Sequence, residues 1–138
     1  MALGISTACL YPMAMEDSLQ TLIDSGFREF EIFINTYSEM EPEFLTMLEE
    51  KLKPQGCRVK SLHPFTSGFE SYLLFSNYER RFQDGASFYR RYFEMARRLG
   101  AEILVIHGDR SFEKSGLNDR EYYDRFGILS RIAREYGV

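Results

Sequence analysis

The stretch Glu102-Ile-Leu-Val-Ile-His-Gly-Asp109 decides the fold. Its four consecutive aliphatic residues are mostly β-branched, and such a run predicts a strand that is buried on both faces. Gly100 ends a helical pattern just before the run, and His107 ends the run with a polar side chain. In parallel α/β folds, ligands bind at the carboxyl ends of the strands. His107 is therefore placed where chemistry is expected.

Working outward, we expect three earlier segments to be strands, and in the second of them apolar and polar residues alternate. These segments are residues 3–9, 27–35 and 58–63. Helical spacing of apolar residues predicts helices over residues 15–26, 42–52, 84–99 and 118–136. Asn118 and Glu121 form the pattern of a capping box at the start of the last helix. An aromatic loop of about twenty residues follows His63, which is long for a compact domain. A short helix over residues 71–77 is expected within it.

The elements follow the order βαβαβαβα, which predicts a parallel sheet with right-handed crossovers. Two α/β architectures fit this order. One is an open doubly wound sheet, and the other is a parallel (βα)4 half of a TIM (β/α)8 barrel, whose usual length is about 250 residues. With 138 residues, the chain is expected to be a single domain over residues 1–138.

Composition excludes several classes of protein. The formal net charge is −4, which opposes non-specific binding to nucleic acid. The apolar runs are too short for a membrane span, and the N-terminus lacks a signal-type core. We therefore expect a cytoplasmic protein, with Cys9 and Cys57 as free thiols and Cys9 as a small buried residue.

Four motifs, taken together in their order and spacing, resemble the xylose isomerase-like TIM-barrel family. This family includes sugar phosphate isomerases and epimerases, and type IV apurinic endonucleases. The resemblance implies the N-terminal half of the barrel, and thus a truncated domain. In the family's sugar isomerases and epimerases, the metal ligands come mainly from strands five to eight. The motifs are Gly26-Phe-Arg-Glu-Phe-Glu31-Ile-Phe, Ser61-Leu-His63-Pro-Phe, Ala96-Arg-Arg-Leu-Gly-Ala-Glu102 and Leu104-Val-Ile-His107-Gly.

His63 and His107 end adjacent strands and are expected to point toward the barrel axis. Neutral imidazole suits divalent metals and sugar hydroxyls. In the endonuclease branch, the resemblance implies that such histidines bind zinc, whereas in the isomerase branch they contact substrate. The alternative is two hydrogen-bonded histidines packed at strand ends. Two histidines alone do not complete a metal site.

Three further polar residues have both a functional and a structural interpretation. Glu31 lies mid-strand, where a carboxylate needs a partner. The resemblance implies substrate contact for Glu31, and the alternative is an ion pair with Arg58 or Lys60. Asn35 is a second candidate for substrate contact. Arg110 could hold a sugar phosphate, although an exposed loop residue is the simpler interpretation.

The resemblance implies the N-terminal half of a divalent-metal-dependent sugar or sugar phosphate isomerase/epimerase, with Mn, Zn, Mg or Co in the intact barrel. In that chemistry a carboxylate removes a proton beside a carbonyl, and the metal stabilises the enediolate. We expect the isolated chain to be inactive. One alternative is a metal enzyme like the type IV apurinic endonucleases, which would need a basic groove. The other is a non-catalytic barrel fragment that self-associates into a homo-oligomer, because its edge strands are unpaired.

Overall fold

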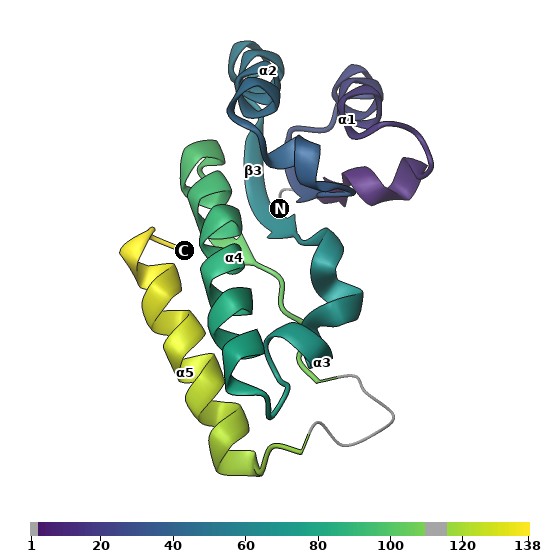
Figure 1. Cartoon of the computed structure of the whole chain (residues 1–138). Coiled ribbons are helices and arrows are strands. Elements are labelled where there is room, and N and C mark those ends of the chain that lie inside the picture. Colours follow the sequence, from purple (N-terminus) through teal and green to yellow (C-terminus); the bar gives the residue numbers. More distant parts are fainter. Residues whose placement is uncertain (1–2, 110–115) are drawn as a thin grey trace.

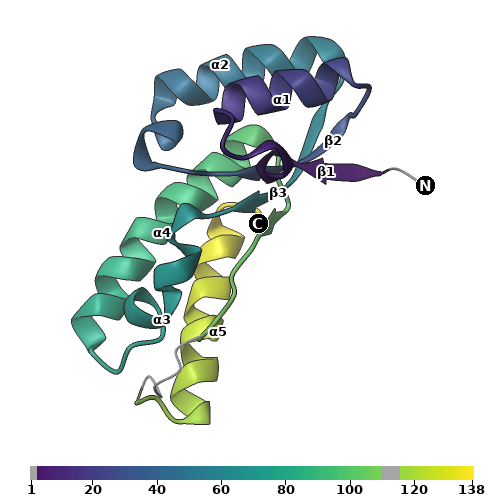
Figure 2. The ribbon, with the colours of Figure 1, turned by 90° about the vertical axis from the view of Figure 1, so that its right-hand side faces the viewer.

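The computed structural model describes residues 3–109 and 116–138, and in these residues one parallel sheet has four strands in the order β1-β2-β3-β4 (Figures 1 and 2). The strands are β1 (Gly4–Ser6), β2 (Glu29–Phe33), β3 (Arg58–His63) and β4 (Ile103–Leu104). A doubly wound sheet would shuffle this order at its switch point. The sequential order is that of half a TIM barrel, which confirms one of the two predicted architectures.

The helices alternate with the strands and cover one face of the sheet, while α5 runs beside α4 (Figures 1 and 2). None of the helices in the described part of the chain is long and apolar enough to cross a membrane. The helices are α1 (Met15–Asp24), α2 (Pro42–Leu52), α3 (Glu70–Leu73), α4 (Glu79–Leu99) and α5 (Asp119–Glu135), and 3-10 turns span Thr7–Leu10, Tyr37–Met40, Lys53–Gln55 and Phe65–Phe69.

The two faces of β2 follow the predicted alternation. Phe30 and Ile32, together with Ile34 just beyond the strand, are completely buried beneath the helices. Glu31 and Phe33 face the other side of the sheet and are partly exposed. The helix-covered face therefore carries the core, and the opposite face, which is the inner side of a barrel, carries polar and aromatic groups.

The prediction that residues 102–107 form a strand buried on both faces is wrong. β4 has only two residues, and Val105 adds one more bond to β3 by donating its N–H to the Leu62 carbonyl. The Ile103 side chain is 57% exposed. Its face is the inner one, which the described residues leave uncovered, and β4 lies at the edge of the sheet. Burial of this run needs a neighbouring strand.

Several predicted boundaries also differ from the structure. The first strand ends at Ser6 because the Ser6 hydroxyl accepts the Ala8 N–H and begins a 3-10 turn, which leaves Cys9 exposed rather than buried. The aromatic loop contains the 3-10 turn and α3, and α4 begins at Glu79, five residues before the predicted start. The capping box of Asn118 and Glu121 is confirmed.

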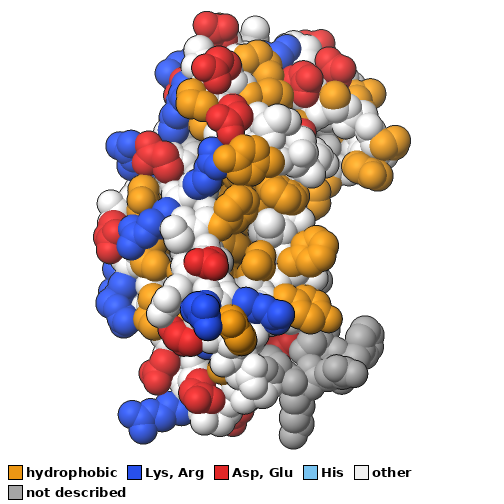
Figure 3. Space-filling view, in the orientation of Figure 1, with side chains coloured by type: hydrophobic (Ala, Val, Ile, Leu, Met, Phe, Trp, Pro, Cys, Tyr) orange, Lys and Arg blue, Asp and Glu red, His pale blue; other side chains and the backbone are white. Residues whose placement is uncertain are grey.

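The surface over α4 and α5 mixes both signs of charge (Figure 3). Several arginines of α4 contact carboxylates. Arg90 pairs with Glu135, and Arg98 pairs with Glu49 of α2. Exposed pairs of this kind contribute little to stability.

Candidate functional site

The two histidines meet at the carboxyl ends of the last two strands. His63 is the last residue of β3, and His107 lies three residues beyond β4. Their Nε2 atoms are 3.2 Å apart, and the ring centroids are 4.7 Å apart with an interplanar angle of 62°. Parallel strands bring their carboxyl ends to one edge of the sheet, so residues 44 positions apart become neighbours. We call His63 and His107 the histidine pair.

An aromatic ring on the inner face of the sheet packs against His63. Phe33 stacks on it with centroids 4.5 Å apart and an interplanar angle of 25°. Burial lowers the pKa of His63 below its ordinary value, and the neighbouring His107 lowers it further. His63 is therefore a neutral imidazole at neutral pH, with one ring nitrogen as a donor and the other as an acceptor.

A carboxylate that sequence reasoning missed lies behind the pair. Glu70, the first residue of α3, is completely buried. Its Oε2 accepts the backbone N–H of His107 at 2.6 Å and that of Gly108 at 2.9 Å. Its Oε1 accepts the Tyr89 hydroxyl at 3.2 Å and lies 3.7 Å from Nδ1 of His107. Glu70 thus fixes the chain just after β4.

Glu70 is also the end of a buried chain of hydroxyl groups. The Thr66 hydroxyl lies 3.2 Å from that of Tyr89 and 3.1 Å from that of Tyr92. Burial raises the pKa of Tyr92 to about 12 and also raises that of Tyr89, so both phenols keep their protons. The hydrogen bonds can therefore all run in one direction: Tyr92 donates to Thr66, Thr66 donates to Tyr89, and Tyr89 donates to Glu70.

The one sequence signal for Glu70 is its isolation. It is the only charged residue between Pro64 and Tyr78 in a segment rich in aromatic residues. A lone carboxylate in such a segment either faces water or is buried with several donors. Neither possibility was predicted for Glu70 from the sequence alone, and the structure shows the second.

Glu31 lies on the inner face one strand away from the pair. It is half-buried, and its Oε2 accepts the Ser61 hydroxyl at 3.2 Å. The ion pairs considered for it are formed by Glu29 instead, which contacts Arg58 and, at 3.8 Å, Lys60. The register between β2 and β3 shifts after Phe30, which places Ser61 opposite Glu31. Substrate contact by Glu31 stays a prediction.

Two further candidates are Asn35 and Arg110. Asn35 is exposed beyond β2, where its side-chain amide donates to the Phe33 carbonyl at 3.3 Å and contacts the Glu39 carboxylate. Its role in substrate contact stays a prediction. Arg110 lies outside the described residues.

The histidine pair has the spacing of two metal ligands. Two imidazole nitrogens at about 2.0–2.1 Å from a tetrahedral Zn²⁺ would be roughly 3.3 Å apart, close to the observed 3.2 Å. In residues 3–109 and 116–138, however, no group of three or more His, Cys, Asp or Glu side chains is placed to hold a metal ion. The pair fits as part of a ligand set, and at least one further ligand would have to come from elsewhere.

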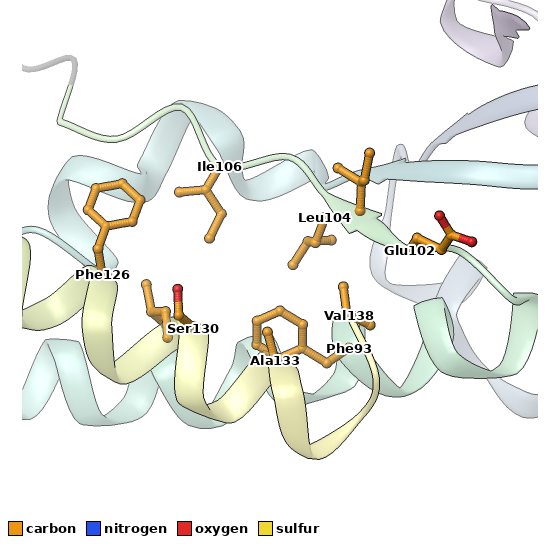
Figure 4. A pocket seen from close by; sticks show the side chains of 10 residues that line it. Phe93, Glu102, Leu104, Ile106, Phe126, Ser130, Ala133 and Val138 are labelled. Atoms are coloured by element: carbon orange, nitrogen blue, oxygen red, sulfur yellow. The ribbon is translucent and has the colours of Figure 1, made fainter.

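A pocket whose lining includes neither histidine lies on the helix side of β4 (Figure 4). It measures about 240 Å³ and lies between the chain around β4 and helices α4 and α5. Its lining is apolar except for Glu102 and Ser130. Because no titratable groups converge on it, we place the candidate site at the histidine pair rather than at this pocket.

The fold is similar to that of solved sugar epimerases. A D-tagatose 3-epimerase-like protein matches with a TM-score of 0.78 and 18% identity, over 100% of this chain and 51% of that chain. The 3-keto-D-glucoside 4-epimerase of E. coli gives a TM-score of 0.71 and 16% identity, over 100% and 54%. D-psicose 3-epimerase from Clostridium cellulolyticum H10 matches with a TM-score of 0.75 and 14% identity, over 100% of this chain and 50% of that chain.

The chain spans about half the length of the solved structures it matches. No protein-family model matches the sequence, and no curated protein sequence matches it significantly. At these identities the similarity establishes the fold. The chain has the fold of one half of a TIM barrel.

Proposed function

We propose that the chain is the N-terminal half of a sugar isomerase or epimerase barrel, in which His63, His107 and Glu31 contact the sugar. The observation that carries the proposal is the histidine pair, with Nε2 atoms 3.2 Å apart at the carboxyl ends of adjacent strands. That end of a TIM barrel holds the active site. The similar solved structures are sugar epimerases by name, which supports the choice of substrate class.

The side chains on this face suit a polyhydroxylated ligand. Neutral imidazoles both donate to and accept from hydroxyl groups, and Glu31 accepts hydrogen bonds. Phe33 offers an apolar ring beside them, as sugar sites commonly need. Sugar and sugar phosphate both remain within the proposal, and the names of the similar structures make ketohexoses the first probes.

The metal belongs to the intact barrel in this proposal. His63 and His107 would be two of its ligands, and a divalent ion would supply stabilisation of negative charge on the sugar oxygens. The bases that move protons at carbon would come from the other half of the barrel. We therefore propose that this chain binds sugar but does not isomerise it alone.

The test uses the fact that the sequence contains two histidines in total, so every imidazole signal comes from the pair. On titration with D-fructose or D-tagatose, we expect both sets of imidazole NMR signals to shift saturably, with Kd on the order of mM. His107→Gln should abolish the shift of His63, and Glu31→Gln should weaken binding about tenfold through the loss of a charged acceptor.

Glu29→Gln is the matched control, because Glu29 is the first residue of the same strand, two residues before Glu31. It should leave the affinity unchanged. Imidazole signals that do not move up to the solubility limit of either ketohexose would refute sugar contact by this half. A shift that persists in His107→Gln would refute the role of the pair.

We propose a second role, self-association between copies of the chain, from a different observation. In the described residues, neither β1 nor β4 has a neighbour on its outer side. Leu3, just before β1, is 75% exposed and Ile103 in β4 is 57% exposed. The apolar pocket beside β4 adds to this surface. A second copy could pair its β1 with this β4 and, by two-fold symmetry, close eight strands.

Sedimentation velocity tests this role. We expect a dimer at micromolar concentration. Ile103→Lys should raise the dissociation constant of the dimer at least tenfold, because it places a charge in the interface. Tyr123→Lys is the control, because Tyr123 is 70% exposed on α5 and away from the sheet edges. A compact monomer at every concentration would refute self-association.

A further inference from the structure

The contact between Glu70 and His107 has two separate parts. One carboxylate oxygen, Oε2, is occupied by the backbone N–H groups of His107 and Gly108. The other, Oε1, accepts the Tyr89 hydroxyl and faces the imidazole Nδ1 of His107 at 3.7 Å. Because Glu70 is completely buried, water does not screen this second contact. The carboxylate therefore acts on the ring as well as on the backbone.

The ring nitrogen that faces Glu70 has no other hydrogen-bond partner among the described residues. A neutral imidazole carries one proton, on Nδ1 or on Nε2. With the proton on Nδ1, a donor nitrogen lies 3.7 Å from an acceptor oxygen, which is too far for a hydrogen bond but close enough for electrostatic attraction. With the proton on Nε2, the lone pair of Nδ1 faces the lone pairs of a carboxylate whose oxygens accept three hydrogen bonds. The first arrangement is attractive and the second is repulsive.

We propose that Glu70 is a positioning residue that holds His107 as the Nδ1–H tautomer and leaves its Nε2 as an acceptor. His63 then donates its Nε2–H across the 3.2 Å contact. A carboxylate behind a histidine commonly fixes its tautomer and ring orientation in this way. In this arrangement the single Nε2 lone pair of His107 is occupied by the His63 N–H, and a hydroxyl proton or a metal ion would reach it by displacing that N–H. The inference concerns the pair itself and does not depend on which ligand it meets.

Nitrogen-15 NMR of the imidazole rings tests the tautomer directly, since Nδ1 and Nε2 have different shifts when protonated and when bare. The measurement is made without ligand, at a pH above which the imidazole signals no longer change. In the wild-type chain, we expect His107 to show a protonated Nδ1 and a bare Nε2. His63 should show the reverse.

Glu70→Gln should reverse the tautomer of His107 while a side chain of the same size still fills the position of Glu70. The amide oxygen of glutamine would keep the two backbone N–H donors, because the NH2 group cannot accept them. The NH2 group would then occupy the place of Oε1 and donate to Nδ1, which moves the ring proton to Nε2. A residue that merely braces the backbone would leave the tautomer unchanged.

Glu29→Gln is the matched control, being another buried glutamate that is replaced isosterically. It should leave both rings as in the wild type. A wild-type His107 with its proton on Nε2 would overturn the proposal, and this result can be read even if Glu70→Gln fails to fold. A folded Glu70→Gln chain with an unchanged His107 tautomer would overturn it too.

Discussion

Glu70→Ala is expected to lower the free energy of unfolding by about 3 kcal/mol or more, because three donors lose their acceptor. The N–H groups of His107 and Gly108 and the hydroxyl of Tyr89 all donate to Glu70. A buried donor left without a partner costs about 1–3 kcal/mol. For a chain of this size the loss corresponds to a fall in Tm of about 10 °C. Thermal and urea unfolding followed by circular dichroism would measure it.

Glu29→Ala is the matched comparison, because Glu29 is also buried but its partners are not. The side chains of Arg58 and Lys60 are 68% and 51% exposed, so they can turn to water once the carboxylate is removed. We expect a loss of about 1 kcal/mol or less. If Glu29→Ala proved as costly as Glu70→Ala, the stability of the site would not depend on the donors that converge on Glu70.

Gly85→Ala is expected to destabilise the chain by about 1–3 kcal/mol. Gly85 lies in α4 where α3 crosses it, and a Cβ at this position would be 2.9 Å from the Leu73 carbonyl oxygen and 3.2 Å from Cδ2 of Leu74. Because the first of these atoms is backbone, α3 must move, and it carries Glu70 with it. The imidazole signals of His107 should shift in the same variant.

Gly127→Ala provides a control of the opposite sign. Gly127 lies within α5, and a Cβ there meets one atom within 4 Å, the Nη1 of Arg131 at 3.6 Å, which is ordinary contact. Alanine stabilises a helix relative to glycine by about 0.8–1 kcal/mol. We expect a gain of this order from urea unfolding. Equal effects of the two substitutions would show that the close approach of α3 to α4 has no energetic consequence.

The sequence predicted the fold where periodicity is local. The alternation around Phe30, Ile32 and Ile34 and the helical stripes determine which faces are buried, whatever their neighbours. The run at 102–107 was misjudged because its burial depends on a strand that must pair with β4. Sequence shows that such a run is apolar but does not show which element covers it.

The candidate site was predicted in part for a similar reason. His63 and His107 end strands, and strand ends converge in any parallel sheet, so their meeting follows from topology. Glu70 was missed because its partners are backbone N–H groups beyond β4 and a tyrosine on α4, which no local pattern reveals. The ion pair that was one of two interpretations of Glu31 is formed by Glu29 instead. The register shift between β2 and β3 that places Ser61 opposite Glu31 cannot be read from the sequence.

The most direct test of the account is the proton Overhauser spectrum of the two imidazole rings in the isolated chain. The central claim is that parallel strands in sequential order bring His63 and His107 together, with ring centroids 4.7 Å apart. We predict a cross-peak between carbon-bound ring protons of the two histidines, which cannot be confused with others because the sequence contains two histidines in total. A folded chain that shows both rings but no cross-peak between them would contradict the half-barrel site.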